Sequence, residues 1–165
     1  MPAGSTYEPI ATTTLGSSAA SIDFTSISSS YTDLVLIFVG KRVSGGNNLH
    51  IRFNSDSGNN YSRTILFGTG SAAGSTRNTN QPQFADFYVG LSSTDDSMHT
   101  FNFINYSNTT TNKTMMWRSE RANEATQSIV GLYRSTSAIS SISLTTPSSN
   151  IAAGSTATLY GIKAA

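Results

Sequence analysis

The sequence predicts an all-β fold, an antiparallel β-sandwich of jelly-roll-like type with about ten or eleven strands. Residues 34–39 are six consecutive apolar residues, rich in β-branched and aromatic side chains, as in an interior strand that is covered on both faces. Most other apolar segments alternate with polar residues, as half-buried strands do. Turn residues separate the segments about every 10 to 15 positions, which favours two packed sheets.

The N-terminal half begins with a short arm, expected over about residues 1–6. Strands are expected over residues 7–15, 21–25, 33–43, 49–53 and 61–67. The run Thr12–Thr14 suits a strand better than a helix. Residues 45–48, Gly-Gly-Asn-Asn, accept the positive φ angles of tight reversals and predict a hairpin. After them, Leu49, Ile51 and Phe53 alternate with His50 and Arg52, so the apolar three are expected to point inward.

The C-terminal half opens with the longest stretch that lacks an apolar pattern. Residues 68–81 are rich in Gly, Ser, Thr and Asn and predict an exposed loop that ends at Pro82. Strands are expected over residues 84–91, 99–106, 113–121, 129–134, 139–144 and 156–162. Residues 120–126 have helix-compatible composition but are too short for a stable helix. No repeat or linker divides the chain, so residues 1–165 are expected to form a single domain.

The composition is polar but carries few charges. Charged residues make up 12% of the 165 positions, about half the usual fraction, and the net charge is +1. The 28 Ser, 22 Thr and 13 Asn supply the polar surface instead. The basic residues are scattered singly, which argues against nucleic-acid binding, and no apolar run is long enough for a membrane span. Cysteine is absent, so stability is expected to come from packing and subunit contacts.

Catalytic chemistry has few candidates in this chain. His50 and His99 are the two histidines, and both are expected to be ordinary surface or rim residues. The carboxylate pairs Asp95–Asp96 and Glu120 with Glu124 are expected to be solvated. No serine lies in a Gly-x-Ser-x-Gly elbow. We therefore expect no enzyme, no catalytic residue and no cofactor.

Two further patterns leave alternatives open. Residues 54–60 have the rhythm of a calcium loop, but they hold one carboxylate and lack the closing glutamate, so a polar turn is favoured and no metal is expected. The second pattern is a set of aromatic residues that offers either stacking platforms for sugar rings or packing in the core and at interfaces. The set is Tyr61, Tyr88, Tyr106, Trp117 and Tyr133.

Three stretches of the sequence carry a resemblance to a known group. Residues 3–11 (AGSTYEPIA), 51–62 (IRFNSDSGNNYS) and 153–165 (AGSTATLYGIKAA) resemble small virion structural proteins of tailed bacteriophages, including phages of cyanobacteria. The likeness spans residues 7–165, and its motifs consist of turn and strand residues. It implies a component of the phage particle with a β-sandwich fold, and it carries over no site residue.

The resemblance leaves two functions open, because relatives also occur as modules of tail-fibre-like proteins. The favoured one is a capsid decoration or cement protein, expected to form homotrimers that bridge subunits of the major capsid protein. The other is a receptor-binding module, attached to a tail protein, that contacts host surface glycan through residues 68–81 and exposed tyrosines. The first residues show no leader with a basic and then an apolar part, so synthesis in the host cytoplasm and assembly into the virion are expected.

Overall fold

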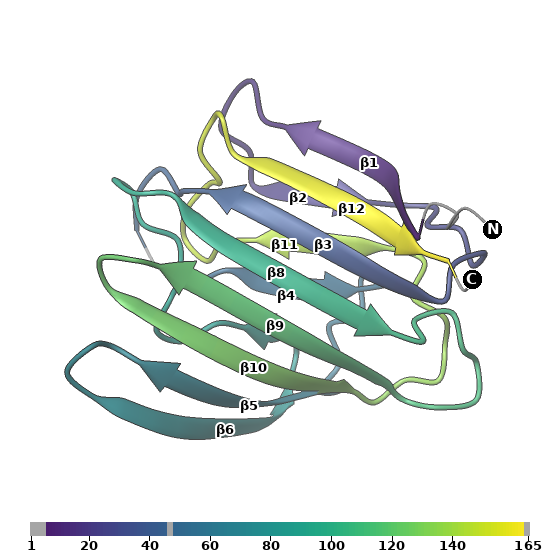
Figure 1. Ribbon diagram of the computed structural model, residues 1–165. Helices are drawn as coiled ribbons and strands as arrows, with labels where there is room; N and C mark the ends of the chain where they lie inside the picture. The colour runs from purple at the N-terminus through teal and green to yellow at the C-terminus, as the bar shows by residue number, and fades with distance from the viewer. Residues whose placement is uncertain (1–5, 46–47, 164–165) are drawn as a thin grey trace.

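The computed structural model describes residues 6–45 and 48–163, and these residues form strands and no helix (Figure 1). The strands are β1 Tyr7–Thr14, β2 Ser21–Phe24, β3 Asp33–Gly40, β4 His50–Phe53, β5 Tyr61–Gly68, β6 Ala73–Gln81, β7 Phe84–Ala85, β8 Ser97–Ile104, β9 Lys113–Arg121, β10 Ala125–Tyr133, β11 Ile142–Thr145 and β12 Thr156–Ile162. The predicted all-β class is therefore confirmed. Of the expected N-terminal arm, only Thr6 lies within the described residues.

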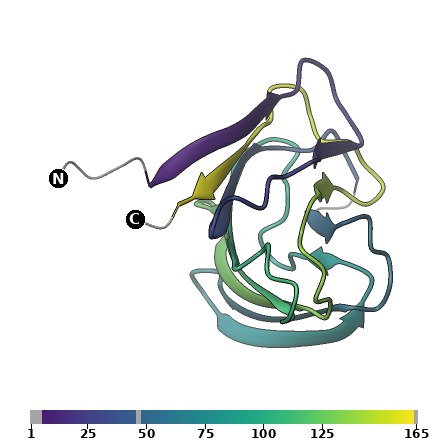
Figure 2. The same ribbon diagram turned by 90° about the vertical axis from the view of Figure 1, so that its right-hand side faces the viewer.

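The strands form two sheets, both antiparallel. The large sheet has eight strands in the order β1-β12-β3-β8-β9-β10-β5-β6, and the small sheet has four in the order β2-β11-β4-β7. Figure 2 shows the large sheet curving round one side of the small sheet. The chain passes repeatedly from one sheet to the other, as in jelly-roll-like sandwiches. The described residues include no helix that could span a bilayer.

The core lies between the two sheets and is built from the alternate residues of nearly every strand. Leu34, Leu36 and Phe38 of β3 are fully buried there, opposite side chains of β4 and β11. Gly131 of β10 lets the Phe84 ring approach closely, since a Cβ at Gly131 would lie 2.7 Å from that ring. Aromatic rings meet edge to face across the layers, as Phe53 and Phe103 do at 5.4 Å between ring centroids.

The structure corrects the prediction that β3 is covered on both faces. Its inward residues are buried, but Val39 on the other face is 42% exposed and Ile37 is half-buried. The strand is interior because β12 and β8 flank it, as the uniform apolar run indicates. The third outward residue, Val35, is buried, so the described residues leave the outward side of this run exposed only toward Val39.

The predicted loop over residues 68–81 is wrong. After a two-residue turn, in which Gly70 has φ 83°, residues 73–81 form the edge strand β6. Backbone pairing with β5 holds this strand, and its side chains are half-buried or exposed, so it has no apolar alternation to detect. The two-residue turn is of the kind that joins hairpin strands with glycine first. Strand β6 adds one to the eleven expected strands and brings the count to twelve.

Two smaller predictions are also corrected. Residues 84–91 form a strand only at Phe84–Ala85, although Val89 and Leu91 beyond it are buried. Residues 45–48 do not join a hairpin, because the chain crosses there from β3 in the large sheet to β4 in the small one; residues 46–47 lie outside the described part. Residues 122–124, within the helix-compatible segment, form the tight turn between β9 and β10.

Candidate functional site

The candidate functional site is the side of the large sheet that faces away from the small sheet, called here the outer face, which is turned toward the viewer in Figure 1. Ten large apolar side chains are at least about a third exposed in the described part of the chain. Eight of them lie on the outer face: Tyr7, Val39, Leu66, Met98, Ile104, Met116, Val130 and Leu132. Such a concentration makes the outer face the candidate interaction surface of the described residues.

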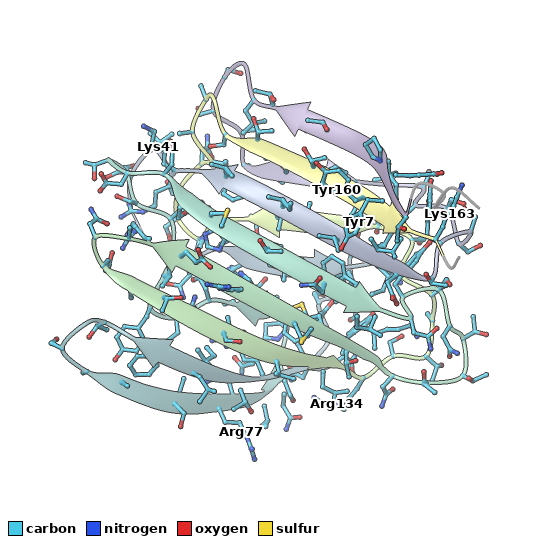
Figure 3. All side chains as sticks on the ribbon, viewed as in Figure 1. Tyr7, Lys41, Arg77, Arg134, Tyr160 and Lys163 are labelled. Atoms are coloured by element: carbon cyan, nitrogen blue, oxygen red, sulfur yellow. The ribbon has the colours of Figure 1, made fainter. Side chains whose placement is uncertain are left out.

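Strand register brings some of these side chains together on the inner strands of the sheet. Met116 of β9 lies opposite Val130 of β10, and both are more than half exposed. One register step away, Thr114 separates Ile104 on β8 from Leu132 on β10. Figure 3 shows Tyr7 and Tyr160 at the β1 side of the sheet and Arg77 at the opposite side. The exposed apolar side chains therefore lie among polar ones, since Met98 lies opposite Glu120 and Met116 opposite Asn102.

The middle of the outer face is electrically neutral. On the outward positions of β3, β8, β9 and β10 between Val35 and Leu132, the charged side chains are Arg118 and Glu120, which form an ion pair. Eight strands about 4.8 Å apart and about eight residues long, at about 3.4 Å per residue, present roughly 1,000 Å². A standard protein interface takes roughly 800 Å² from each partner. The face is large enough for a stable contact that depends little on charge.

His99 was predicted to be a surface or rim residue, and this is wrong, since its side chain is fully buried. The Trp117 indole N–H donates to His99 Nδ1 at 3.2 Å, so the ring proton lies on Nε2, which donates to Ser97 Oγ at 3.0 Å. The Ser97 hydroxyl donates in turn to the Gly40 carbonyl at 3.2 Å. Burial and the charge of Arg121 lower the pKa of His99 to about 3. The neutral ring links Trp117 to Ser97 in a buried series of hydrogen bonds that ends at the Gly40 carbonyl.

His50 lies half-buried on β4, on the polar side of that strand as predicted. The Gln83 side-chain amide donates to His50 Nδ1 at 2.6 Å. Burial, followed by the charges of Arg63 and Arg52, lowers the pKa of His50 to about 4. Neither histidine is placed beside a serine that it could activate at an open surface, since Ser97 is buried with His99.

The two carboxylate pairs lie at one end of the sandwich. Asp95 accepts hydrogen bonds from Thr94 Oγ1 at 2.8 Å and Asn123 Nδ2 at 3.2 Å, which lower its pKa. Glu120 and Glu124 both line a cleft of about 470 Å³ between the β5–β6 and β9–β10 turns. Each is ion-paired there, Glu120 with Arg118 and Glu124 with Arg121. The cleft is polar and close to neutral, with hydrogen-bonding groups and no free carboxylate pair.

Residues 54–60 form a turn whose polar side chains are hydrogen-bonded to other groups of the protein. Asp56 accepts from the Gly58 N–H at 2.7 Å, the Asn60 amide at 2.8 Å and the Tyr133 hydroxyl at 2.9 Å, and the Asn60 bond contributes most to its lowered pKa. Asn54, at φ 51°, ties this turn to the Ala138 carbonyl at 2.8 Å. Among the described residues no three His, Cys, Asp or Glu side chains gather as metal ligands would. The polar-turn interpretation accounts for all of these contacts.

Most of the aromatic residues that could have been sugar platforms lie in the core. Tyr61, Tyr106, Trp117 and Tyr133 are at most 2% exposed, so packing is the alternative that holds for them. Tyr88 is half-buried and stacks on Phe67 with ring centroids 3.8 Å apart.

One buried charged residue carried no signal in the sequence. Asp86 is fully buried just after β7, where its Oδ2 accepts from the Leu49 N–H at 3.1 Å. Its Oδ1 has no partner among the described residues, and neither has the buried Nε of Arg63. Burial raises the pKa of Asp86 well above its usual range, against the opposing effect of the Leu49 bond and of Arg63 and Arg121. This residue fastens the irregular segment after β7 to the start of β4.

Comparison with known proteins does not identify a family for this chain. No protein-family model and no curated protein matches the chain. Among solved structures, it is similar to the crystal structure of the galectin LEC-6 from Caenorhabditis elegans, at 11% identity and a TM-score of 0.37. That alignment covers 90% of this chain and 94% of the galectin chain. At this TM-score the likeness adds nothing to the β-sandwich that the strands themselves establish.

Proposed function

We propose that the protein is a non-enzymatic structural component of a phage virion, acting as a capsid decoration protein that docks through its outer face. The single observation that carries the proposal is the concentration of exposed apolar side chains on that face. An apolar surface of this extent is stable in water when a partner covers it, and its neutral charge suits repeated contacts at high local concentration. The resemblance of three sequence stretches to phage virion proteins is the reason for placing the protein in a virion.

The docking partner in this proposal is the head lattice. The outer face would lie across neighbouring subunits of the major capsid protein, so that each copy adds interface area that resists internal pressure. Burying Met116 and Val130, which are 54% and 58% exposed and lie opposite each other, would place an apolar gain at the centre of the contact. In this proposal the small sheet and the polar turns remain in water.

A second candidate function is favoured by the cleft beside the β5–β6 turn. Arg118, Asn123 and the backbone of residues 68–70 offer donors, and Glu120 and Glu124 offer acceptors, in a cleft of about 470 Å³. Such a lining suits a neutral polyhydroxylated ligand. The protein would then be a receptor-binding module of tail-fibre type that contacts host surface glycan. The cleft lacks an exposed aromatic platform, so we rank this function second.

Two added charges in the outer face should abolish docking. We expect the double variant M116K/V130K to bind at least tenfold more weakly than the wild type to particles assembled without the protein, because docking would bury two unpaired ammonium groups. Bound protein is measured on sedimented particles by quantitative gel densitometry. Binding of the wild type should change little between low and high salt, since the centre of the face is neutral.

The matched control is S17K/S18K, which adds the same two charges in the exposed connection between β1 and β2. It should bind like the wild type. Melting curves of both double variants show whether each is folded. If folded M116K/V130K bound as tightly as S17K/S18K, docking through the outer face would be disproved.

A further inference from the structure

Strand β6 is a long open edge of the large sheet, and its bulge lies only at its C-terminal end, beyond Asn78. Exposed sheet edges are normally blunted by proline, bulges or short length. The opposite edge, β1, has Pro9 and a register shift beside it. In the small sheet the edge strands β2 and β7 have four and two residues. β6 has nine residues, no proline and one charged residue, Arg77.

The backbone groups that β6 turns outward follow from its pairing with β5. The Thr69 N–H donates to the Ala72 carbonyl at 2.8 Å, which fixes the hydrogen-bonded pair next to the turn. Hydrogen-bonded pairs then alternate along an antiparallel ladder, so Gly74, Thr76 and Asn78 bond to β5. Ser75 and Arg77 therefore direct their N–H and C=O groups away from the sheet. No described residue outside β5 and β6 forms a backbone hydrogen bond to them.

We propose that β6 pairs antiparallel with β6 of a second copy of this chain, around a two-fold axis at Thr76. The regularly paired part of the strand, before the bulge at residues 79–80, runs over residues 73–78, and Thr76 lies near its middle. This register bonds Ser75 of each copy to Arg77 of the other and sets the two Thr76 side chains opposite each other, a favourable pair. A register centred on Arg77 would oppose two like charges.

A second copy is the occupant because β6 complements itself. An isologous contact matches the same free N–H and C=O groups on both sides, and it leaves no further β6 edge open. Pairing with β1 instead would meet the Pro9 position, which has no N–H, and the irregular register after it. The two large sheets become one continuous sheet with a shared outer face. This inference does not rest on the proposed function.

Single cysteines test the register, because the chain has no cysteine of its own. In T76C the two sulfur-bearing residues face each other in a non-hydrogen-bonded pair, with Cα atoms about 4.5 Å apart, within disulfide range. In S75C the two cysteines are offset by two residues, about 8 to 9 Å apart, beyond that range. Mild oxidation should cross-link T76C at least tenfold faster than S75C, giving a covalent dimer of two 17.5 kDa chains.

A proline tests the backbone pairing itself. S75P removes an outward N–H and leaves the bonds to β5 in place, whereas S75A keeps the N–H. By sedimentation equilibrium at up to roughly 1 mM, since a small edge interface is weak, wild type and S75A should show dimer and S75P only monomer. Equal cross-linking of T76C and S75C, or a wild type that is monomeric or trimeric throughout, would overturn the inference. M116K/V130K should still dimerise, so the two docking proposals can fail separately.

Discussion

Leu36→Asp should abolish folding. Leu36 is fully buried at the middle of β3, where its side chain points into the core between the two sheets. The change removes a large apolar side chain, which costs about 2 to 5 kcal/mol, and it buries a carboxylate without a partner, which costs several kcal/mol more. The total is comparable to the whole stability of a domain of this size. Circular dichroism and solubility of the purified variant measure the result.

The matched control lies on the same strand. Val39→Asp introduces the same carboxylate at a position that is 42% exposed on the outer face, so it should change the free energy of unfolding by about 1 kcal/mol or less. A soluble, normally folded Leu36→Asp variant would show that β3 is not the interior strand on which the two sheets are built.

Acid should destabilise the protein through His99. The folded state lowers the pKa of this ring to about 3, whereas the unfolded chain has the usual value near 6.5, so the unfolded state binds the proton more readily. Stability from the neutral ring is complete above about pH 6.5 and is lost progressively as the pH falls toward 3. Between pH 7 and pH 5 the loss is about 2 kcal/mol. Protonation of His99 Nδ1 would also replace the acceptor of the Trp117 N–H with a second N–H donor, so this hydrogen bond would be lost.

His99→Gln isolates this contribution, because glutamine can accept from Trp117 but does not titrate in this range. Asp86 acts in the opposite sense, since a carboxyl with a raised pKa in the folded state gains stability as the pH falls. It is present in both proteins and cancels in the comparison. Urea unfolding at pH 7, 6 and 5 should show a smaller loss in His99→Gln by about 2 kcal/mol at pH 5. Equal losses in the two proteins would contradict the assigned role of the ring.

The strands with clear alternation could be predicted from the sequence. β9 and β12 have the predicted bounds, 113–121 and 156–162, because buried side chains such as Met115 and Trp117 of β9 and Leu159 of β12 alternate with outward ones. β6 could not be predicted, since hydroxyl and amide side chains at an exposed edge leave no apolar period and the strand is defined by backbone bonds to β5. The depth of His99 was also hidden, because its partner Trp117 lies on a different strand.

The candidate site could be predicted only in part. The apolar run 34–39 indicates a need for cover on both faces, and the chain itself covers the inward side. Val39 is the exposed residue of that run on the outer face, and in the docking proposal the capsid lattice covers it. Val39 lies opposite Met98 although β3 and β8 are far apart in the sequence, and Met116 lies opposite Val130 on the consecutive strands β9 and β10. Their gathering depends on strand order, which sequence periodicity does not specify.

The most direct measurement is the number of copies of this protein in a purified phage particle, determined by quantitative mass spectrometry against the major capsid protein. A protein that covers a head lattice through its outer face is repeated with the lattice, so on the order of hundreds of copies are expected. A count on the order of tens or fewer, or absence from the particle, would contradict a decoration role, and a count in the tens would instead favour the tail-fibre function.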